Sequence, residues 1–358
     1  MADRRTFIAG MVATGLIPKS TWADAGNPAY LSAGMKLNGT YVLCGLNKHG
    51  EITFELPLPD RGHAAAAHPL RADAVAFARR PGTYAIILDC TSGREKARLE
   101  APSGRHFYGH GAFSADGELL FTTENDYEAA RGVVGVWDAR QKYKRLGEFA
   151  SGGVGPHDIK LMPDDATLVV ANGGIETHPE TGRTKLNLPS MRPNLCYLNF
   201  DGHTQERVEL SEALRKNSIR HLAVSLDATV AFAMQWQGDV SAHPPLLGTH
   251  RIGEAVRLIG STPEDNRQMA GYAGSIAISE TMGAVAVTSP RGGAMQVFDM
   301  VSAKVLSQVA IEDVCGVSAG SEDFVVTNGL GGVFSNPTTG MNQSAHHPMR
   351  WDNHLVPI

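Results

Sequence analysis

The 358-residue sequence is poor in charged side chains, and its charge has the wrong sign for binding nucleic acid. Only 19% of the residues are Asp, Glu, Lys or Arg, against roughly a quarter in average proteins. Acidic residues outnumber basic ones by 37 to 32, and no run of Lys or Arg exceeds two. A protein that grips a phosphate backbone needs a basic stripe or patch. We therefore do not expect nucleic acid as a partner.

Aromatic residues are also few, at 7%, and no apolar run approaches the ~20 residues needed to span a membrane. Hydrophobic residues still make up 42% of the chain, which is enough for a large core. Glycine is abundant, with 39 residues. Many glycines between short apolar runs are typical of many tight turns and many short strands.

The sequence has only four cysteines, Cys44, Cys90, Cys196 and Cys315. They are far apart and form no C-x-x-C pair, so no zinc site, haem attachment or thioredoxin-like motif is indicated. Cys44 and Cys90 lie in apolar runs typical of core strands. We favour buried free thiols. A disulfide remains an alternative if the compartment is oxidising and the fold brings two of the cysteines together.

The first 25 residues resemble an export signal. A charged start with Arg4-Arg5 precedes the apolar stretch 7–17, and an A-x-A site follows at residues 23–25. The paired arginines are typical of the twin-arginine route, which carries folded proteins. We expect a removed signal at 1–25, a single domain at 26–358 and a periplasmic location. A cytosolic N-terminal helix is the alternative.

A repeat organises the rest of the chain. Histidines open similar units at His63, His110 and His157, 47 residues apart, and His221 opens the next after a polar insertion at 175–190. Each unit has a short apolar strand, an Asp-centred turn, a second apolar strand and a polar end. Removing 25 residues leaves 333, which is close to seven units of 47.

Four strands in 40–50 residues are typical of a propeller blade. We predict an all-β fold, a seven-bladed β-propeller with four-stranded blades. The terminal piece 351–358 is expected to pair with the first blade and so close the ring. A two-sheet sandwich would explain the strands but not the period of 47 residues.

In a propeller, the start of each inner strand and the end of the next strand share one rim of the channel. The units open at Ser32, His63, His110, His157, His221, Gly274 and Gly316, so four histidines are predicted to face one funnel. The other predicted rim residues are Glu124, Asn172, Gln235, Arg291 and Asn328. His68, Glu176 and His178 are expected in adjoining loops, and His354 reaches the rim if the closing strand carries it there.

Three interpretations of these histidines stay open. They cap strand starts, they hold a metal, or they line a small-molecule site. Imidazole ligands suit iron, copper or zinc better than calcium, and iron or copper is the cofactor we consider. In an enzyme, His110 or His157 would act as a base beside Glu124 or Glu176.

Several strings resemble the bacterial exported family called domain of unknown function 1513. They are the segments 77–82, 157–159, 170–179, 218–223, 288–293 and 351–354. The resemblance spans about residues 33–354. The resemblance implies a propeller and a twin-arginine signal. The genes of this family commonly lie beside genes for imelysin-like iron proteins and di-haem proteins. The resemblance supplies no catalytic residues.

The sequence thus supports a periplasmic binding or accessory protein of an iron or other metal acquisition system. Imelysin-like or di-haem proteins are the partners considered, and we expect a monomer without a membrane span. The alternative is a propeller enzyme, either a lactonase-like hydrolase or a metal-dependent oxidoreductase. A scaffold with an inert rim is a third possibility.

Overall fold

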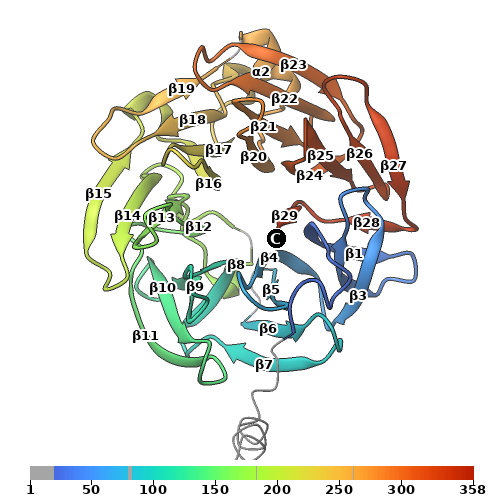
Figure 1. The fold of residues 1–358 in the computed structure, drawn as a ribbon. Helices are drawn as coiled ribbons and strands as arrows, with labels where there is room; N and C mark the ends of the chain where they lie inside the picture. Colours follow the sequence, from blue (N-terminus) through green and yellow to red (C-terminus); the bar gives the residue numbers. More distant parts are fainter. Residues whose placement is uncertain (1–19, 80–82, 183, 261) are drawn as a thin grey trace, which may run out of the picture.

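The chain folds into seven antiparallel sheets arranged as blades around a central channel (Figure 1). The computed structural model describes residues 20–358 apart from 80–82, 183 and 261. Each blade has four strand positions, numbered here from the channel outward. The predicted seven-bladed, all-β propeller is confirmed.

Six blades run outward in chain order. Their inner strands are β4 (Gly62–Ala67), β8 (Arg105–Phe113), β12 (Pro156–Leu161), β16 (Asn217–Val224), β20 (Ser275–Ser279) and β24 (Val314–Ala319). Their second strands are β5 (Asp73–Ala78), β9 (Leu119–Asp126), β13 (Thr167–Asn172), β17 (Val230–Trp236), β21 (Ala284–Ser289) and β25 (Phe324–Asn328).

The third strands are β6 (Tyr84–Asp89), β10 (Arg131–Asp138), β14 (Asn194–Asn199), β18 (Leu247–His250), β22 (Ala294–Asp299) and β26 (Gly332–Ser335). The outer strands are β7 (Glu95–Glu100), β11 (Lys144–Ala150), β15 (Thr204–Glu209), β19 (Arg257–Ile259), β23 (Val305–Ala310) and β27 (Asn342–His346). One short helix, α2 (Pro263–Gln268), follows β19.

The burial of each strand follows from its position. Second and third strands pack on both faces against neighbouring blades, so their apolar runs are almost wholly buried. Phe121 and Val134 of one blade, for example, share a core with Val170 and Cys196 of the next. Outer strands such as β15 alternate between exposed and half-buried residues, as expected for a sheet edge beside water.

The remaining blade closes the ring with both ends of the chain. Its outer three positions are β1 (Tyr30–Lys36), β2 (Tyr41–Leu46) and β3 (Ile52–Leu58). Two short C-terminal strands, β28 (Met349–Trp351) and β29 (Val356–Pro357), pair with β1 on the channel side. The C-terminus therefore lies near the centre of the ring (Figure 1). The predicted pairing of the two terminal segments is confirmed.

This closure corrects the predicted opening residue of the first blade. Ser32 lies on β1, which is the second strand of its blade rather than the inner one. The inner position is taken by the C-terminal segment, and His354 lies between its two short strands. The Ser32 hydroxyl donates a 2.8 Å hydrogen bond to the His354 carbonyl oxygen. Ser32 thus hydrogen-bonds to His354, which occupies the inner position predicted for Ser32.

The inner strands are irregular where they enter the channel. The pairing register shifts between Gly62 and Ala65, between Phe107 and Gly111, between Pro156 and Asp158, and between Ile219 and His221. Such bulges kink a strand and re-aim its side chains. Each of the four predicted channel histidines lies in or directly beside one of these bulges.

All four cysteines lie in the described part of the chain, where they are buried and unpaired. The expectation of free thiols is confirmed. Burial raises the pKa of the Cys44 and Cys90 thiols to about 12, so both stay protonated and unreactive. None of the helices in the described residues combines the length and hydrophobicity needed to cross a membrane.

The start of the predicted export signal, residues 1–19, lies outside the described residues. Residues 20–25, the end of that signal, pack on the propeller. The Trp22 indole N–H donates to the His68 carbonyl oxygen at 2.9 Å, and the Ala72 amide donates to the Ser20 carbonyl oxygen at 3.0 Å. Ala25 is 6% exposed. Cleavage after Ala25 would remove these contacts from the mature protein.

Candidate metal centre

Five histidines from five blades meet inside the channel. Their imidazole rings belong to His63, His110, His157, His221 and His354, and each residue is at most 8% exposed. Four of the rings form a circuit with centroid separations of 4.8 to 5.7 Å, in the order His63, His354, His221, His157. We call this group the five-histidine cluster.

His110 lies at the middle of the five-histidine cluster. Its ring centroid is 5.0 Å from that of His63, 5.2 Å from His157, 5.6 Å from His221 and 4.8 Å from His354. Two groups of three ligand nitrogens lie within 4.8 Å of one another, one in His63, His110 and His354 and one in His110, His157 and His221. His110 is common to both.

The cluster separates two cavities in the channel. One, of about 430 Å³, includes Arg79, Lys185, Arg220 and Arg291 in its lining, and we call it the cationic chamber. The other, of about 420 Å³, is lined largely by alanines and other apolar residues of the inner strands, and we call it the alanine chamber. His63 and His157 line the first, His110 and His354 the second, and His221 lines both.

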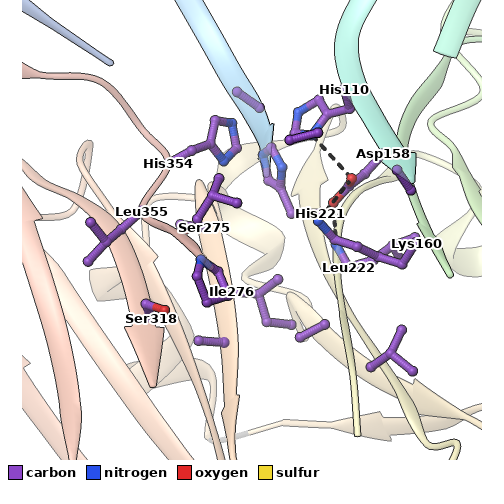
Figure 2. A pocket seen from close by; sticks show the side chains of 18 of the residues that line it. His110, Asp158, Lys160, His221, Leu222, Ser275, Ile276, Ser318, His354 and Leu355 are labelled. Carbon is purple, nitrogen blue, oxygen red and sulfur yellow. Dashed lines mark hydrogen bonds and ion pairs between the residues drawn. The ribbon is translucent and has the colours of Figure 1, made fainter. Parts of the chain in front are cut away.

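Asp158 orients the central histidine. Its Oδ1 lies 3.1 Å from His110 Nδ1, and Lys160 Nζ lies 3.6 Å from the same oxygen. The carboxylate also accepts hydrogen bonds from the backbone amides of Ile159 and Leu222, at 2.8 and 2.9 Å. Figure 2 shows His110 and Asp158 beside each other at the wall of the alanine chamber.

The charge of Asp158 fixes the tautomer of His110. Burial alone would raise the pKa of Asp158, but the Lys160 ammonium and the His110 imidazole outweigh it and hold the pKa far below 3.8. An ionised Asp158 only accepts hydrogen bonds, so His110 Nδ1 carries the proton. In this tautomer the lone pair of a neutral His110 ring lies on Nε2. A carboxylate behind a histidine in this way is a usual support of metal-bound imidazole.

The other rings are neutral at pH 7. Burial, followed by the influence of neighbouring imidazoles and guanidinium groups, lowers the pKa of His63, His157 and His354 well below 6.5. Burial also lowers the pKa of His221 to about 3. Neutral imidazole is the form that binds metal ions, because one nitrogen keeps a free lone pair.

Four of the buried imidazole nitrogens have no hydrogen-bond partner within the described part of the chain. They are His63 Nδ1, His110 Nε2, His221 Nδ1 and His354 Nε2. A buried polar atom left without a partner costs about 1–3 kcal/mol. Four such atoms in one cluster are unusual in a native protein, and a bound metal ion is one way to satisfy them.

His157 differs from the others. Its Nδ1 lies 3.4 Å from Nη1 of Arg220, a residue that is 6% exposed. Because a guanidinium only donates, His157 Nδ1 accepts and the ring proton sits on Nε2. His157 is therefore less suited to metal binding than the other four, which points to His63, His110 and His354 as the better group of three ligands.

Two glycines leave the space that the five-histidine cluster and the segments around it occupy. Gly109 has φ +99°, and a Cβ there would lie 2.5 Å from His63 Cδ2. A Cβ on Gly316 of β24 would lie 2.6 Å from the backbone nitrogen of Leu355. The first glycine lets β8 pass against the His63 ring, and the second lets the C-terminal segment reach the channel with His354.

Three predicted rim residues have structural roles inside the blades instead. Glu124 is fully buried and forms a double ion pair with Arg145 of the outer strand β11, at 2.8 and 2.9 Å. The Asn172 side chain bonds to Ser151 and Asn194. Asn328 donates to the Glu312 carbonyl oxygen and accepts from the Gly332 amide. Their side chains close the ends of blades and do not line either chamber.

The predicted loop residues also lie apart from the cluster. His68 Nδ1 accepts from the amides of Leu70 and Arg71, and its Nε2 lies 3.0 Å from the Gly117 carbonyl oxygen. His178 is half-buried, 3.4 Å from Glu128. Glu176 is half-buried too and lines neither chamber. The structure thus brings neither Glu124 nor Glu176 beside His110 or His157, and Asp158 takes the place predicted for them.

Gln235 and Arg291 line the cationic chamber as predicted for rim residues. Sequence reasoning missed Asp158 and Arg220, although both stand next to a predicted histidine, in His157-Asp158 and Arg220-His221. The signal that could have found both residues is a charged side chain next to a predicted histidine on an inner strand, where burial requires a partner.

Together, fold and site define a class of protein, a seven-bladed β-propeller whose channel is divided by a cluster of buried histidines. The chain belongs to the family described as "Protein of unknown function (DUF1513)", which it matches over residues 56–358. The family resemblance in the sequence is therefore confirmed.

Comparison with other proteins adds information on the fold alone. No protein of curated function matches the sequence. Among solved structures, the chain is similar to a Kuenenia stuttgartiensis hydrazine synthase, with a TM-score of 0.59 and 11% identity over 97% of this chain and 98% of that one. At this identity the similarity indicates a shared architecture and carries no chemistry over to this protein.

Proposed function

We propose that this propeller binds a divalent first-row transition metal ion at the five-histidine cluster and serves as a binding or accessory protein in metal acquisition. The observation that carries the proposal is the convergence of four buried, unpartnered imidazole nitrogens in the channel. His63, His110 and His354 supply the three ligands, and His221 belongs to the second group of three, with His110 and His157.

The ligand chemistry narrows the choice of metal. Neutral imidazoles suit Cu²⁺, Zn²⁺ and Fe²⁺, whereas Ca²⁺ and Mg²⁺ require oxygen ligands. The affinity of such a site rises toward Cu²⁺ in the first-row series. Iron or copper is therefore the cargo we propose, with copper bound more tightly in vitro.

The biological setting is part of the same proposal. The twin-arginine pattern at Arg4-Arg5 supports export to the periplasm, and that route carries proteins that have already folded. Imelysin-like or di-haem proteins are the partners we infer from the family resemblance. Neutral, buried imidazoles match a role in holding a metal ion, because they bind the ion without first losing a proton.

The test is metal analysis of the full-length protein after expression with export. We expect close to one equivalent of copper or iron, and titration of the metal-free protein with Cu²⁺, Zn²⁺ or anaerobic Fe²⁺ should show binding and a raised melting temperature. His110→Gln should abolish both effects, because His110 belongs to both groups of ligands.

A matched control is His178→Gln, which changes a half-buried histidine on the rim outside the cluster. It should bind metal as the unmodified chain does. No metal in the exported protein, together with no stabilisation by any of the three ions, would overturn the proposal.

One observation favours a second function, that of an enzyme. The Asp158–His110 pair has the geometry of an oriented general base, with Nε2 of His110 facing the cluster. A lactonase-like hydrolase or a metal-dependent oxidoreductase would use it. Lactone hydrolysis by the metal-free protein that is lost in His110→Gln would favour the hydrolase over metal binding.

A further inference from the structure

The cationic chamber carries four positive side chains in a protein whose net charge is −5. They are Arg79, Lys185, Arg220 and Arg291, contributed by different blades and loops. Among the described residues, no Asp or Glu lines this chamber. Asp352 lies 3.8 Å from Arg79 and also forms an ion pair with Arg61. The chamber is therefore an electropositive hollow on an acidic protein.

Several of these cations are held in place. Arg220 is 6% exposed and lies against His157. The Arg291 guanidinium stacks on the Tyr272 ring, 4.4 Å from its centroid, and Lys185 donates to the side-chain oxygen of Gln237. Held guanidinium groups lose little freedom when they bind a carboxylate or phosphate in a two-pronged contact.

The rest of the lining suits an organic anion better than a bare inorganic one. Tyr108, Trp236 and Tyr272 offer aromatic surface, while Gln235, Gln237 and Asn353 offer neutral polar groups. A volume of about 430 Å³ is in the range of small-ligand sites. Cations spread around such a space match several carboxylates on a carbon skeleton rather than one compact phosphate.

The chamber is also the one that His63, His157 and His221 line. An anion held by the arginines therefore lies directly beside the five-histidine cluster. A metal ion bound there by imidazoles alone keeps its full positive charge, so an adjacent anion is attracted by the metal as well as by the arginines.

We propose that the cationic chamber binds a small di- or tricarboxylate anion, and that the metal ion reaches the histidines as the chelate of this anion. The inference rests on the proposed metal-binding function and adds its substrate class. The exchange is a ligand substitution: imidazole nitrogens of the cluster replace carboxylate oxygens on the metal, the released carboxylates pair with the arginines, and no electron is transferred.

The first test measures anion binding without metal. Citrate is titrated into the metal-free full chain by calorimetry at an ionic strength of about 0.15 M, alongside inorganic phosphate. We expect citrate to bind, and the double variant Lys185→Gln/Arg291→Gln to weaken it by about tenfold or more, the usual scale for lost charge-assisted contacts. Both side chains are exposed, so the variant is expected to fold.

The matched control is Lys48→Gln/Lys304→Gln, which removes the same charge from exposed sites outside the chamber. It should retain citrate binding within about twofold, because neither lysine lines the chamber. Equal citrate binding by the chamber variant and the control overturns the inference. Phosphate binding as tight as citrate binding also overturns it, since the chamber would then be a phosphate site.

The second test follows copper transfer from copper citrate to the protein by the absorption band of the imidazole-bound ion. We expect transfer to Lys185→Gln/Arg291→Gln to be slower by about tenfold, while uptake of copper from a non-coordinating buffer is unchanged. Equal transfer rates would refute delivery as a chelate. Failure of copper to bind in either form would instead refute the proposed metal function, whatever the citrate result.

Discussion

Nδ1 of His110 lies 3.1 Å from Oδ1 of Asp158, and both side chains are 4% exposed. The same carboxylate binds the backbone amide of Leu222 in the next blade. One buried charge thus fixes the tautomer of the central histidine and ties together the inner strands β12 and β16.

The first prediction concerns this carboxylate. Asp158→Asn keeps the size of the side chain but removes the charge that holds the His110 proton on Nδ1. We expect Cu²⁺ affinity to fall by about 10–100-fold, the range for supporting residues of metal-bound histidine. Asp323→Asn is the control, because Asp323 is equally buried, bonds to Phe324 and Thr338 and touches no histidine of the cluster. Calorimetric titration of both variants with Cu²⁺ tests this expectation, and an equal loss of affinity in the two variants would contradict the role of Asp158.

The second prediction is that the cluster makes the protein sensitive to acid. Burial lowers the pKa of His63, His157 and His354 well below 6.5, and that of His221 to about 3. Between pH 6.5 and these lowered values, the unfolded chain binds more protons than the folded one. The free energy of unfolding therefore falls as the pH drops below 6.5, by up to about 1.4 kcal/mol per pH unit for each histidine.

Urea unfolding of the metal-free protein at pH 7.5 and 5.5 measures this loss. In His221→Gln/His354→Gln the loss should be smaller, because two of the titrating groups are gone. His346→Gln, at an exposed site in β27, should behave as the unmodified chain does. Asp158 does not blur the comparison, since its ordinary pKa lies below this window. A pH dependence that the double variant leaves intact would contradict the argument.

The third prediction concerns Gly109. Gly109→Ala places a Cβ 2.5 Å from His63 Cδ2 at a φ of +99°, so we expect a loss of about 1–3 kcal/mol of stability from backbone strain. Metal affinity should also fall, because the His63 ring must move. Gly104→Ala is the control, with φ +77° and no neighbour within 4 Å of its Cβ. Thermal unfolding and Cu²⁺ titration of the pair separate strain from displacement, and unchanged metal affinity in Gly109→Ala would show that His63 is not a ligand.

The fourth prediction concerns the end of the export signal. Intact mass of the exported protein should show a chain beginning at Gly26, as the A-x-A site predicts. Such a chain lacks the Trp22–His68 hydrogen bond, worth about 1 kcal/mol. It should therefore melt at a lower temperature than the chain beginning at residue 20, and Trp22→Ala in the longer chain should reproduce most of the difference. A mature chain that keeps Trp22 would move the cleavage site upstream.

The sequence was sufficient to predict the propeller and most of the cluster. The 47-residue spacing of His63, His110 and His157 reflects one repeated position, the start of an inner strand. Because every inner strand faces the same channel, equal positions in the repeat become neighbours in space. His354 could be proposed for the same reason once ring closure was considered.

The supporting residues could not be predicted in this way. Asp158 and Arg220 lie beside the histidines because a bulge at each site turns two adjacent side chains toward the channel. The two-residue alternation of a regular strand does not show where a bulge inserts its extra residue. Glu124 was misplaced at the rim for a related reason. Its partner Arg145 is on β11, the fourth strand position from the channel, and only the folded blade reveals the ion pair.

The origin of His354 in the closing segment has a consequence for the proposed metal site. His63 and His110 come from the inner strands β4 and β8, but His354 reaches them only when β28 and β29 pair with β1. An open ring therefore lacks the group formed by His63, His110 and His354, and a metal ion bound by that group would join the closing segment to β4 and β8. Occupancy of the proposed site would then require a closed ring, and loss of the ion would weaken the docking of the closing segment on the blades beside it.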